Sequence, residues 1–277
     1  MPELSVPHTS ASDPSRRVLV AEDNVINQRV AVAMLRHLGF DVDVVADGAD
    51  AVRAALATHY RLILMDCQLP GLDGYRATAE IRRLQEPPRR TPVIAVTGSE
   101  AAADRQRCLA AGMDDHVAKP LRLKALTSLI SRWAPQGPPA SVTDEPAEPS
   151  KVNGSAADPD RAVLDAGVVA RLERLGAAAG EDLLGQLAAL FLADAQTRVG
   201  SLRQALAEGD ALAVVRSAHS LTGSSSNLGA TELSRLCGIL AADGRAAELV
   251  GRSALIDGIE AELDRVRSAL DALVPAA

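Results

Sequence analysis

The chain has 277 residues, a length that predicts about two domains, and its 47% hydrophobic content is enough for buried cores even though only 2% is aromatic. A net charge of −7 and the lack of a basic tract argue against direct binding of nucleic acid. No apolar run is long enough to insert into a membrane, and three widely spaced cysteines form neither a disulfide nor a zinc pattern, which favours a reducing cytoplasm.

Two segments are not expected to fold. Residues 1–16 lack the apolar core of a signal peptide and are expected to be a disordered leader. Residues 134–160 are rich in Pro, Ser, Gly and acidic residues without apolar periodicity, which predicts a flexible linker. The charge also differs across this linker, with 16 Lys/Arg against 14 Asp/Glu in residues 17–133 and 11 against 16 in residues 160–277. We therefore expect two domains, at 17–133 and 161–277.

The first domain alternates short apolar runs with helical patterns. Strands are expected at RVLVA, DVDVV, LILMD, PVIAVT and DHVA, and a helix follows each of them. Asn24 is expected to cap the first helix, which Gly39 ends, and Gly112 is expected to end the fourth helix. This alternation predicts an α/β fold with a doubly wound, five-stranded parallel sheet.

In such a sheet the active crevice lies at the carboxyl ends of the strands. Five polar residues stand at or just after predicted strand ends: Glu22, Asp23, Asp66, Thr97 and Lys119. A single acid at a strand end is ordinarily a helix cap, but the set as a whole indicates a catalytic rim. Clustered carboxylates repel one another unless they bind a cation, and an all-oxygen ligand set favours Mg²⁺.

Mg²⁺ and a lysine together can neutralise a phosphoryl group during transfer, and one carboxylate can then act as the nucleophile. Asp66 is the candidate nucleophile because it precedes the loop CQLPGLDG, in which Gly71 and Gly74 permit close backbone approach. The remaining members of the set are expected to hold the metal, Glu22 and Asp23, or to bind phosphoryl oxygens, Thr97 and Lys119.

The ordered motifs VLVAEDN, LILMDCQLPGLDG, PVIAVTG and DDHVAKP resemble the receiver domain of two-component response regulators, in the variety carried by hybrid histidine kinases. The resemblance covers residues 17 to about 133 and implies a flavodoxin-like fold with the roles given above. It also implies that the backbone carbonyl of Gln68 completes the metal site. The bond between Lys119 and Pro120 is implied to be cis.

His116 stands three residues before Lys119, where many receivers carry Tyr or Phe. The resemblance implies that the residue at this position moves together with Thr97 on phosphorylation. A half-buried strand residue without a switching role is an equally open interpretation of His116.

Two other enzyme classes fit the sequence less well. Haloacid-type phosphatases also use an aspartyl nucleophile but carry a second Asp two residues later, where this chain has Gln68. No G-x-x-x-x-G-K-[ST] or G-x-G-x-x-G motif follows a predicted strand, which disfavours a nucleotide-binding fold.

The second domain contains helical patterns and no strand-like run. Helices are expected at 168–175, 181–206, 211–228, 230–243 and 254–273. Short Gly/Asp connections suggest that neighbouring helices are antiparallel. The pattern predicts an all-α bundle of about four long helices.

His219 lies on the third of these helices, among small residues. At 100° per residue the buried stripe of this helix is expected to contain Val214, Ala218, Leu221, Ser225 and Leu228. His219 lies away from that stripe and has no second ligand at metal-binding spacing, so an accessible imidazole that carries a phosphoryl group is the favoured interpretation. A structural role is the alternative.

The segment AHSLTGSSSNLGA resembles the signature of histidine-phosphotransfer (HPt) domains, four-helix bundles that pass phosphoryl groups between receivers. The resemblance extends over about residues 160–275 and implies that His219 carries the phosphoryl group and that Gly223 clears space for a partner. The family usually has Lys three residues after the histidine, where this chain has Thr222. Threonine can donate a hydrogen bond but cannot offset charge, so we expect slower transfer or a shorter-lived phosphoryl group than with lysine.

These patterns predict a phosphorelay protein with a histidine kinase as donor and a downstream receiver as partner. The chain contains no kinase catalytic core, and the receiver is expected to catalyse its own aspartyl phosphorylation and dephosphorylation. The alternative is a binding module switched by phosphorylation, with a degenerate HPt domain for docking. Whether the chain stands alone or forms part of a hybrid kinase is left open.

Overall fold

The computed structural model of the protein describes residues 16–85, 90–98, 102–134, 162–243 and 252–273. Apart from residues 16 and 134, the leader and the linker expected from the sequence lie outside the described residues. The chain forms two compact units, which are described one at a time.

The first unit contains the five predicted strands. These are β1 (Arg17–Ala21), β2 (Asp41–Val45), β3 (Leu62–Asp66), β4 (Val93–Thr97) and β5 (Asp115–Ala118). Their order in the sheet is β2-β1-β3-β4-β5, and β1 pairs in parallel with β2 and β3, as β3 does with β4. The chain thus winds outward in both directions from β1 and β3, which confirms the doubly wound parallel sheet.

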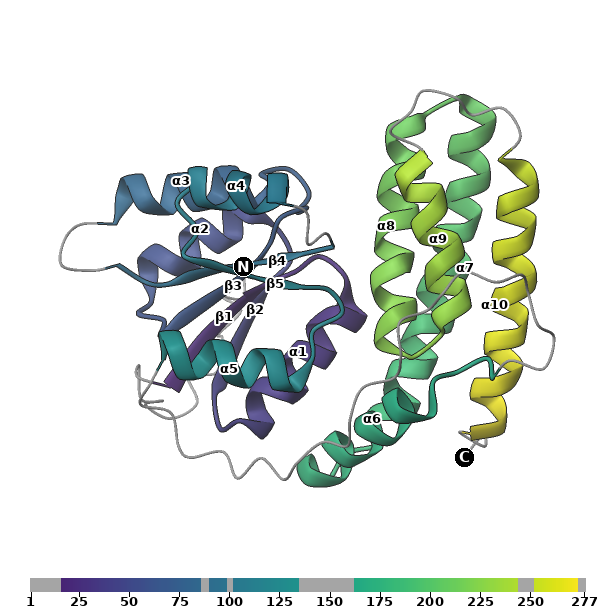
Figure 1. Ribbon diagram of the computed structural model, residues 1–277, viewed down its shortest axis with the longest axis horizontal. Helices are drawn as coiled ribbons and strands as arrows, with labels where there is room; N and C mark the ends of the chain where they lie inside the picture. The colour runs from purple at the N-terminus through teal and green to yellow at the C-terminus, as the bar shows by residue number, and fades with distance from the viewer. Residues whose placement is uncertain (1–15, 86–89, 99–101, 135–161, 244–251, 274–277) are drawn as a thin grey trace, which may run out of the picture. The chain divides into compact units, whose positions relative to one another are not determined.

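Five helices connect and follow these strands. They are α1 (Val25–His37), α2 (Gly48–Ala57), α3 (Gly74–Leu84), α4 (Ala102–Ala110) and α5 (Leu123–Trp133). Helices α2, α3 and α4 lie on one face of the sheet, and α5 lies on the other (Figure 1). The sheet is therefore the middle of three layers.

Local sequence signals set the ends of these helices. The Asn24 side chain accepts hydrogen bonds from the backbone N–H groups of Ile26 and Asn27, at 2.9 and 3.2 Å, as expected of an N-cap. Gly39 and Gly112 have φ values of 83° and 90°, a conformation that favours glycine and ends a helix. All three predictions of helix ends are confirmed.

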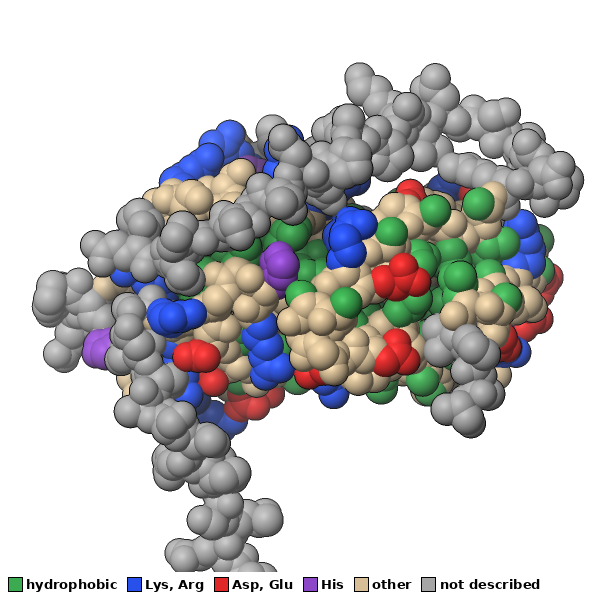
Figure 2. All heavy atoms as spheres, turned by 90° about the horizontal axis from the view of Figure 1, so that it is seen from below, with side chains coloured by type: hydrophobic (Ala, Val, Ile, Leu, Met, Phe, Trp, Pro, Cys, Tyr) green, Lys and Arg blue, Asp and Glu red, His purple; other side chains and the backbone are tan. Residues whose placement is uncertain are grey.

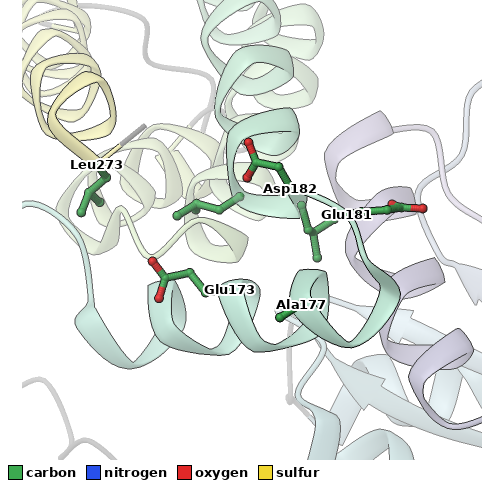
Figure 3. A pocket seen from close by; sticks show the side chains of 7 residues that line it. Glu173, Ala177, Glu181, Asp182 and Leu273 are labelled. Atoms are coloured by element: carbon green, nitrogen blue, oxygen red, sulfur yellow. The ribbon is translucent and has the colours of Figure 1, made fainter. Parts of the chain in front are cut away.

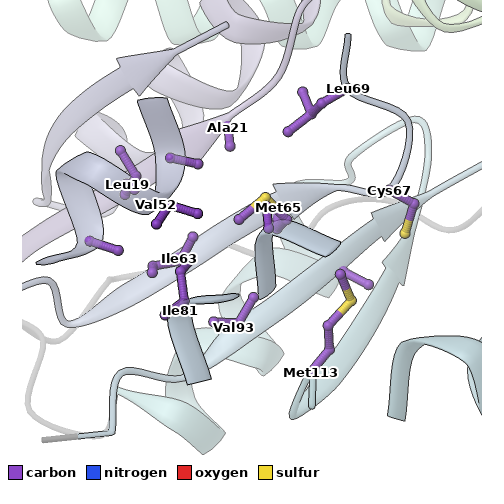
Figure 4. Close-up of a cluster of buried hydrophobic side chains, with 14 of the residues drawn as sticks. Leu19, Ala21, Val52, Ile63, Met65, Cys67, Leu69, Ile81, Val93 and Met113 are labelled. Atoms are coloured by element: carbon purple, nitrogen blue, oxygen red, sulfur yellow. The ribbon is translucent and has the colours of Figure 1, made fainter. Parts of the chain in front are cut away.

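The core of this unit is aliphatic, as the low aromatic content requires. Strands β3 and β4 are buried along their whole length, whereas the edge strand β2 is partly exposed. Between the sheet and the α2–α3 layer, side chains from the strands meet those of the two helices (Figure 4). The labelled members include Leu19, Ile63, Met65 and Val93 on strands and Val52 and Ile81 on helices.

The second unit is a helical bundle. Its helices are α6 (Ala166–Ala179), α7 (Leu183–Glu208), α8 (Ala211–Asn227), α9 (Thr231–Asp243) and α10 (Ser253–Leu273). Helix α8 packs against α7 and α9, and α10 packs against the same two helices, so these four helices close a bundle (Figure 1). None of the helices in the described ranges combines the length and hydropathy that crossing a lipid bilayer requires.

Candidate functional site

Three carboxylates meet at the carboxyl ends of β1 and β3. Glu22 and Asp23 follow β1, Asp66 ends β3, and the ligand oxygens of the three lie within 4.8 Å of one another. Glu22 and Asp66 are buried, with 5% and 3% of their surface exposed, whereas Asp23 is exposed. Negative charges placed this closely in a buried setting require a compensating cation. The donor set fits a hard divalent ion such as Mg²⁺.

The loop after β3 holds Asp66 in place through its backbone. The N–H of Gln68 donates to Oδ1 of Asp66 at 3.0 Å, and the N–H of Gly74 donates to the carbonyl of Cys67 at 3.2 Å. A Cβ at position 74 would overlap the carbonyl oxygen of Asp66, and Gly71 has a φ of 68°. Both glycines of the CQLPGLDG loop are thus required by backbone geometry.

Gly48 also supports this loop, although nothing in the sequence singled it out. A Cβ at Gly48 would overlap the carbonyl oxygen of Leu72, which lies in the loop that follows Asp66. The sequence around Gly48 gives little sign of this requirement, because a glycine directly after the N-cap Asp47 is ordinary at a helix start. The close approach depends on how α2 packs against α3.

The order of the strands sets the positions of Thr97 and Lys119. Asp66 pairs in register with Val96, so Thr97 is the next residue on the neighbouring strand, and it is buried with 6% exposure. Lys119 comes directly after β5, which neighbours β4, and is partly exposed. The peptide bond between Lys119 and Pro120 is cis, as the resemblance implied.

His116 is a partly exposed residue of β5, with 27% of its side chain accessible. Its Nδ1 lies 3.7 Å from Oδ1 of Asp115. Burial raises the pKa of Asp115, but hydrogen bonds from Trp133 and from the His116 backbone, together with the charge of Arg132, hold it below its usual value. The placement matches the half-buried strand residue, and the switching role stays a prediction.

In the bundle, the predicted buried stripe of α8 is confirmed. Its five members are each at most 1% exposed: Val214, Ala218, Leu221, Ser225 and Leu228. His219 lies outside this stripe and is partly exposed. Asp210 caps the helix by accepting a hydrogen bond from the backbone N–H of Ala213 at 2.9 Å. The histidine is therefore held on a well-formed helix without contributing to its core stripe.

Thr222 and Gly223 occupy the next turn of α8, and both are partly exposed. The Thr222 hydroxyl donates to the carbonyl oxygen of Ala218 at 2.9 Å, within its own helix. The Thr222 carbonyl accepts a hydrogen bond from Ser234 of α9 at 3.0 Å, and a Cβ built at Gly238 would lie 3.9 Å from the Thr222 methyl group. Thr222 therefore faces α9, and its hydroxyl already has an acceptor.

A surface pocket of about 380 Å³ lies elsewhere in the bundle, between α6, the start of α7 and the end of α10 (Figure 3). Its lining combines acidic and aliphatic side chains, among them Glu173, Asp182 and Leu273. Neither His219 nor any of the residues expected to bind a phosphoryl group lines this pocket. On the face shown in Figure 2, charged side chains of both signs are scattered among hydrophobic ones.

Two separate segments of the chain match known protein families. Residues 18–131 match the family described as the response regulator receiver domain, and residues 186–269 match the Hpt domain. The signal transduction histidine-protein kinase BarA of Shigella flexneri is 31% identical over 235 residues, which are 85% of this chain and 24% of BarA. The sensor protein GacS of Pseudomonas syringae pv. syringae is 29% identical over 229 residues, which are 82% of this chain and 24% of GacS.

Among solved structures, the receiver domain of the sensor histidine kinase PA1611 from Pseudomonas aeruginosa PAO1 is 50% identical, covering 44% of this chain and 98% of that domain, with a TM-score of 0.41. The chain spans between 4% and 25% of the length of the curated relatives that it matches. The two family matches fall on the α/β unit and on the helical bundle. The chain therefore combines a response regulator receiver domain with an Hpt domain.

Proposed function

We propose that this chain is a phosphoryl carrier in a phosphorelay, in which a histidine kinase phosphorylates Asp66 and the group moves to His219. The observation that carries the proposal is the cluster of Glu22, Asp23 and Asp66 on the same chain as an HPt bundle whose histidine lies off the core. A downstream receiver domain would exchange the phosphoryl group with His219. The closely spaced carboxylates supply the acceptor chemistry, and the bundle supplies a second carrier.

At the first acceptor, an Asp66 oxygen attacks the phosphorus, an O–P bond forms, and the bond to the donor breaks. The donor then leaves as histidine or, with acetyl phosphate, as acetate. Thr97 would donate a hydrogen bond to one phosphoryl oxygen and Lys119 would pair with another. Glu22, Asp23, Asp66 and the backbone carbonyl of Gln68 would hold Mg²⁺. When bound, this ion supplies positive charge that offsets the repulsion between the phosphoryl group and the carboxylates.

At the second acceptor, an unprotonated imidazole nitrogen of His219 attacks the same phosphorus. A P–N bond forms, the P–O bond breaks, and the Asp66 carboxylate is restored. The proton on the other ring nitrogen of the imidazolium product passes to water. Gly223 would leave room for the partner that approaches His219.

In this proposal a receiver at 17–133 and an HPt domain at 161–277 act together, joined by residues 134–160. We place the protein in the cytoplasm, a reducing compartment, where thiols stay reduced. Cys67, Cys108 and Cys237 are all free and buried, which supports this placement.

The test is to phosphorylate the full chain with radiolabelled acetyl phosphate and Mg²⁺, and to separate the products by stability. Aspartyl phosphate is lost in base, whereas phosphohistidine survives base and is lost in acid. The wild type is expected to carry both kinds of label. Asp66→Asn is expected to lose both, because an amide is not a comparable nucleophile, and Asp23→Ala to lose most label with its metal ligand. His219→Gln is expected to keep only the base-labile label.

Matched controls exist within the chain. Asp41→Asn and His59→Gln change exposed residues of the same types in the receiver, and both are expected to label like the wild type. Wild-type levels of label on Asp66→Asn would refute the assigned nucleophile. If His219→Gln collapses the bundle, the histidine is structural and the carrier role is wrong.

The second candidate is a binding module in which phosphorylated Asp66 only switches contacts with a partner. The bonding of Thr222 favours it, because the Thr222 hydroxyl already donates to the Ala218 carbonyl and a lysine is missing there. Base-labile label on Asp66 with none on a folded, unmodified His219 would establish this alternative.

A further inference from the structure

Arg216 is the one Asp, Glu, Lys or Arg residue in the 17 residues of α8. It lies three residues before His219, one helical turn away, and its side chain is exposed. Residues three apart on a helix lie side by side, with Cβ atoms about 5–6 Å apart.

Within the described residues, Arg216 of α8 differs in its ion pairing from all the arginines of α7, α9 and α10. Those arginines each form an ion pair with a carboxylate, at 2.5–3.3 Å: Arg198, Arg203, Arg235, Arg265 and Arg267. Arg216 forms no ion pair in the described part of the chain. Positions 212, 213, 219 and 220, one turn away on either side, are Leu, Ala, His and Ser. Its guanidinium is therefore available to an anion that arrives at His219.

Thr222, one turn to the other side, is not suited to that task. It carries no charge, its hydroxyl donates to the Ala218 carbonyl at 2.9 Å, and its methyl group faces α9. A phosphoryl group would also add negative charge to a region, residues 160–277, that has 11 Lys/Arg against 16 Asp/Glu. A cation close to His219 is thus needed, and α8 has one.

We propose that Arg216 binds the phosphoryl group carried by His219. It supplies the positive charge that Thr222 cannot supply. This inference rests on the proposed carrier function of His219. The planar guanidinium can donate two parallel N–H···O bonds to phosphoryl oxygens, and such charge-assisted pairs are stronger than the single neutral bond of a hydroxyl. Arg216 then stabilises the group during transfer and lowers the pKa of its last ionisation.

The test uses full-length Asp66→Asn protein, so that label on His219 cannot move to Asp66. Phosphoramidate is the donor, because its P–N bond breaks as the His219 P–N bond forms and ammonia leaves. Labelling is followed as base-stable phosphate, and the pKa of the bound phosphoryl group is read from a ³¹P NMR titration.

Arg216→Ala and Arg216→Gln are expected to slow labelling by about three- to tenfold, a modest effect because the site is exposed. The phosphoryl pKa is expected to rise by about 0.3–1 unit in both variants, since an opposite charge has been removed. Arg216→Lys should keep most of the rate, and added salt should narrow the difference between the parent and the neutral variants.

The matched control is Arg174→Ala on α6, an exposed arginine that also lacks an ion pair among the described residues. It is expected to label within twofold of the parent and to leave the ³¹P titration unchanged. Parental rates and an unchanged phosphoryl pKa in folded Arg216→Gln would overturn the role of Arg216 while leaving the carrier function intact. If the parent itself acquires no base-stable label, the carrier function fails, and this inference fails with it.

Discussion

At the scale of single residues, partners decide what a side chain can do. Thr222 shows this in the bundle, because the bond from its hydroxyl to Ala218 removes the one hydrogen bond that it could offer a ligand. In the receiver, the Arg82 side chain has a structural role. Its guanidinium donates to the carbonyls of Gly112 and Thr91 at 2.8 and 2.9 Å and to Asp114 at 2.6 Å, with 13% of its side chain exposed.

Arg82→Ala is expected to lower the free energy of unfolding of the receiver by about 2–3 kcal/mol. The change removes these hydrogen bonds and a fourth to Gln85 at 3.3 Å, and it leaves the Asp114 carboxylate, 8% exposed, with Arg90 as its remaining cation. Because Arg90 still pairs with Asp114, the expected loss of stability is smaller than for a buried charge left without any partner. Urea unfolding, followed by a spectroscopic signal from the α/β unit, measures the difference in free energy of unfolding between the variant and the wild type.

Arg83 is the control for this prediction. It pairs with Glu80 at the surface, where 65% of the arginine side chain is exposed. Arg83→Ala is expected to leave the urea midpoint unchanged, because water screens exposed pairs. Equal losses in the two variants would contradict the structural role assigned to the Arg82 network.

At the scale of elements, two helical glycines differ in whether a Cβ could be added. Comparing them distinguishes the entropic cost of glycine from the steric need for it. Gly200 lies inside α7, and a Cβ there meets no atom within 4 Å. Gly200→Ala is therefore expected to stabilise the bundle by about 0.5–1 kcal/mol, because alanine loses less conformational entropy in a helix. Thermal unfolding followed by circular dichroism at a helical wavelength provides the measurement.

Gly176, near the end of α6, is the matched counterpart. A Cβ at this position would lie 2.6 Å from the carbonyl oxygen of Glu181, closer than real Cβ contacts allow. Gly176→Ala is expected to destabilise the bundle, since backbone atoms would have to move. Stabilisation by both substitutions would show that α6 and α7 do not pack as described.

At the scale of the whole molecule, buried thiols in both units couple stability to alkaline pH. Burial raises the pKa of Cys67 in the receiver to about 12 and that of Cys237 in the bundle to about 12. In the unfolded chain a thiol ionises near pH 8.5. Between these values the unfolded state has lost protons that the native state still holds, so stability falls as pH rises.

We therefore expect the free energy of unfolding to decrease from pH 8.5 upward, by about 1–2 kcal/mol for each buried thiol at pH 10. Urea titrations at pH 7, 8.5 and 10 measure this slope. Cys237→Ala should flatten the slope for the bundle transition alone. Stability that rises between pH 8.5 and 10 would contradict the burial of these thiols.

Much of this fold could be predicted from local sequence. The five strands and the helices of both units follow from apolar periodicity. Asn24 caps the start of α1 through bonds to near neighbours, and Gly39 ends this helix with a positive φ. The buried stripe opposite His219 was also predictable, because position on a helix depends only on spacing along the chain. The site residues stood out because parallel strands bring their carboxyl ends to one edge.

Other features were decided by packing between segments that are distant in sequence. The spacing of the Glu22, Asp23 and Asp66 oxygens depends on the register of β1 with β3, and the need for glycine at position 48 depends on the backbone of Leu72. The orientation of Thr222 toward α9 likewise required the bundle to close. Periodicity determines which face of an element is buried, but the atoms that a side chain meets are set by the neighbouring element, which one segment of sequence does not specify.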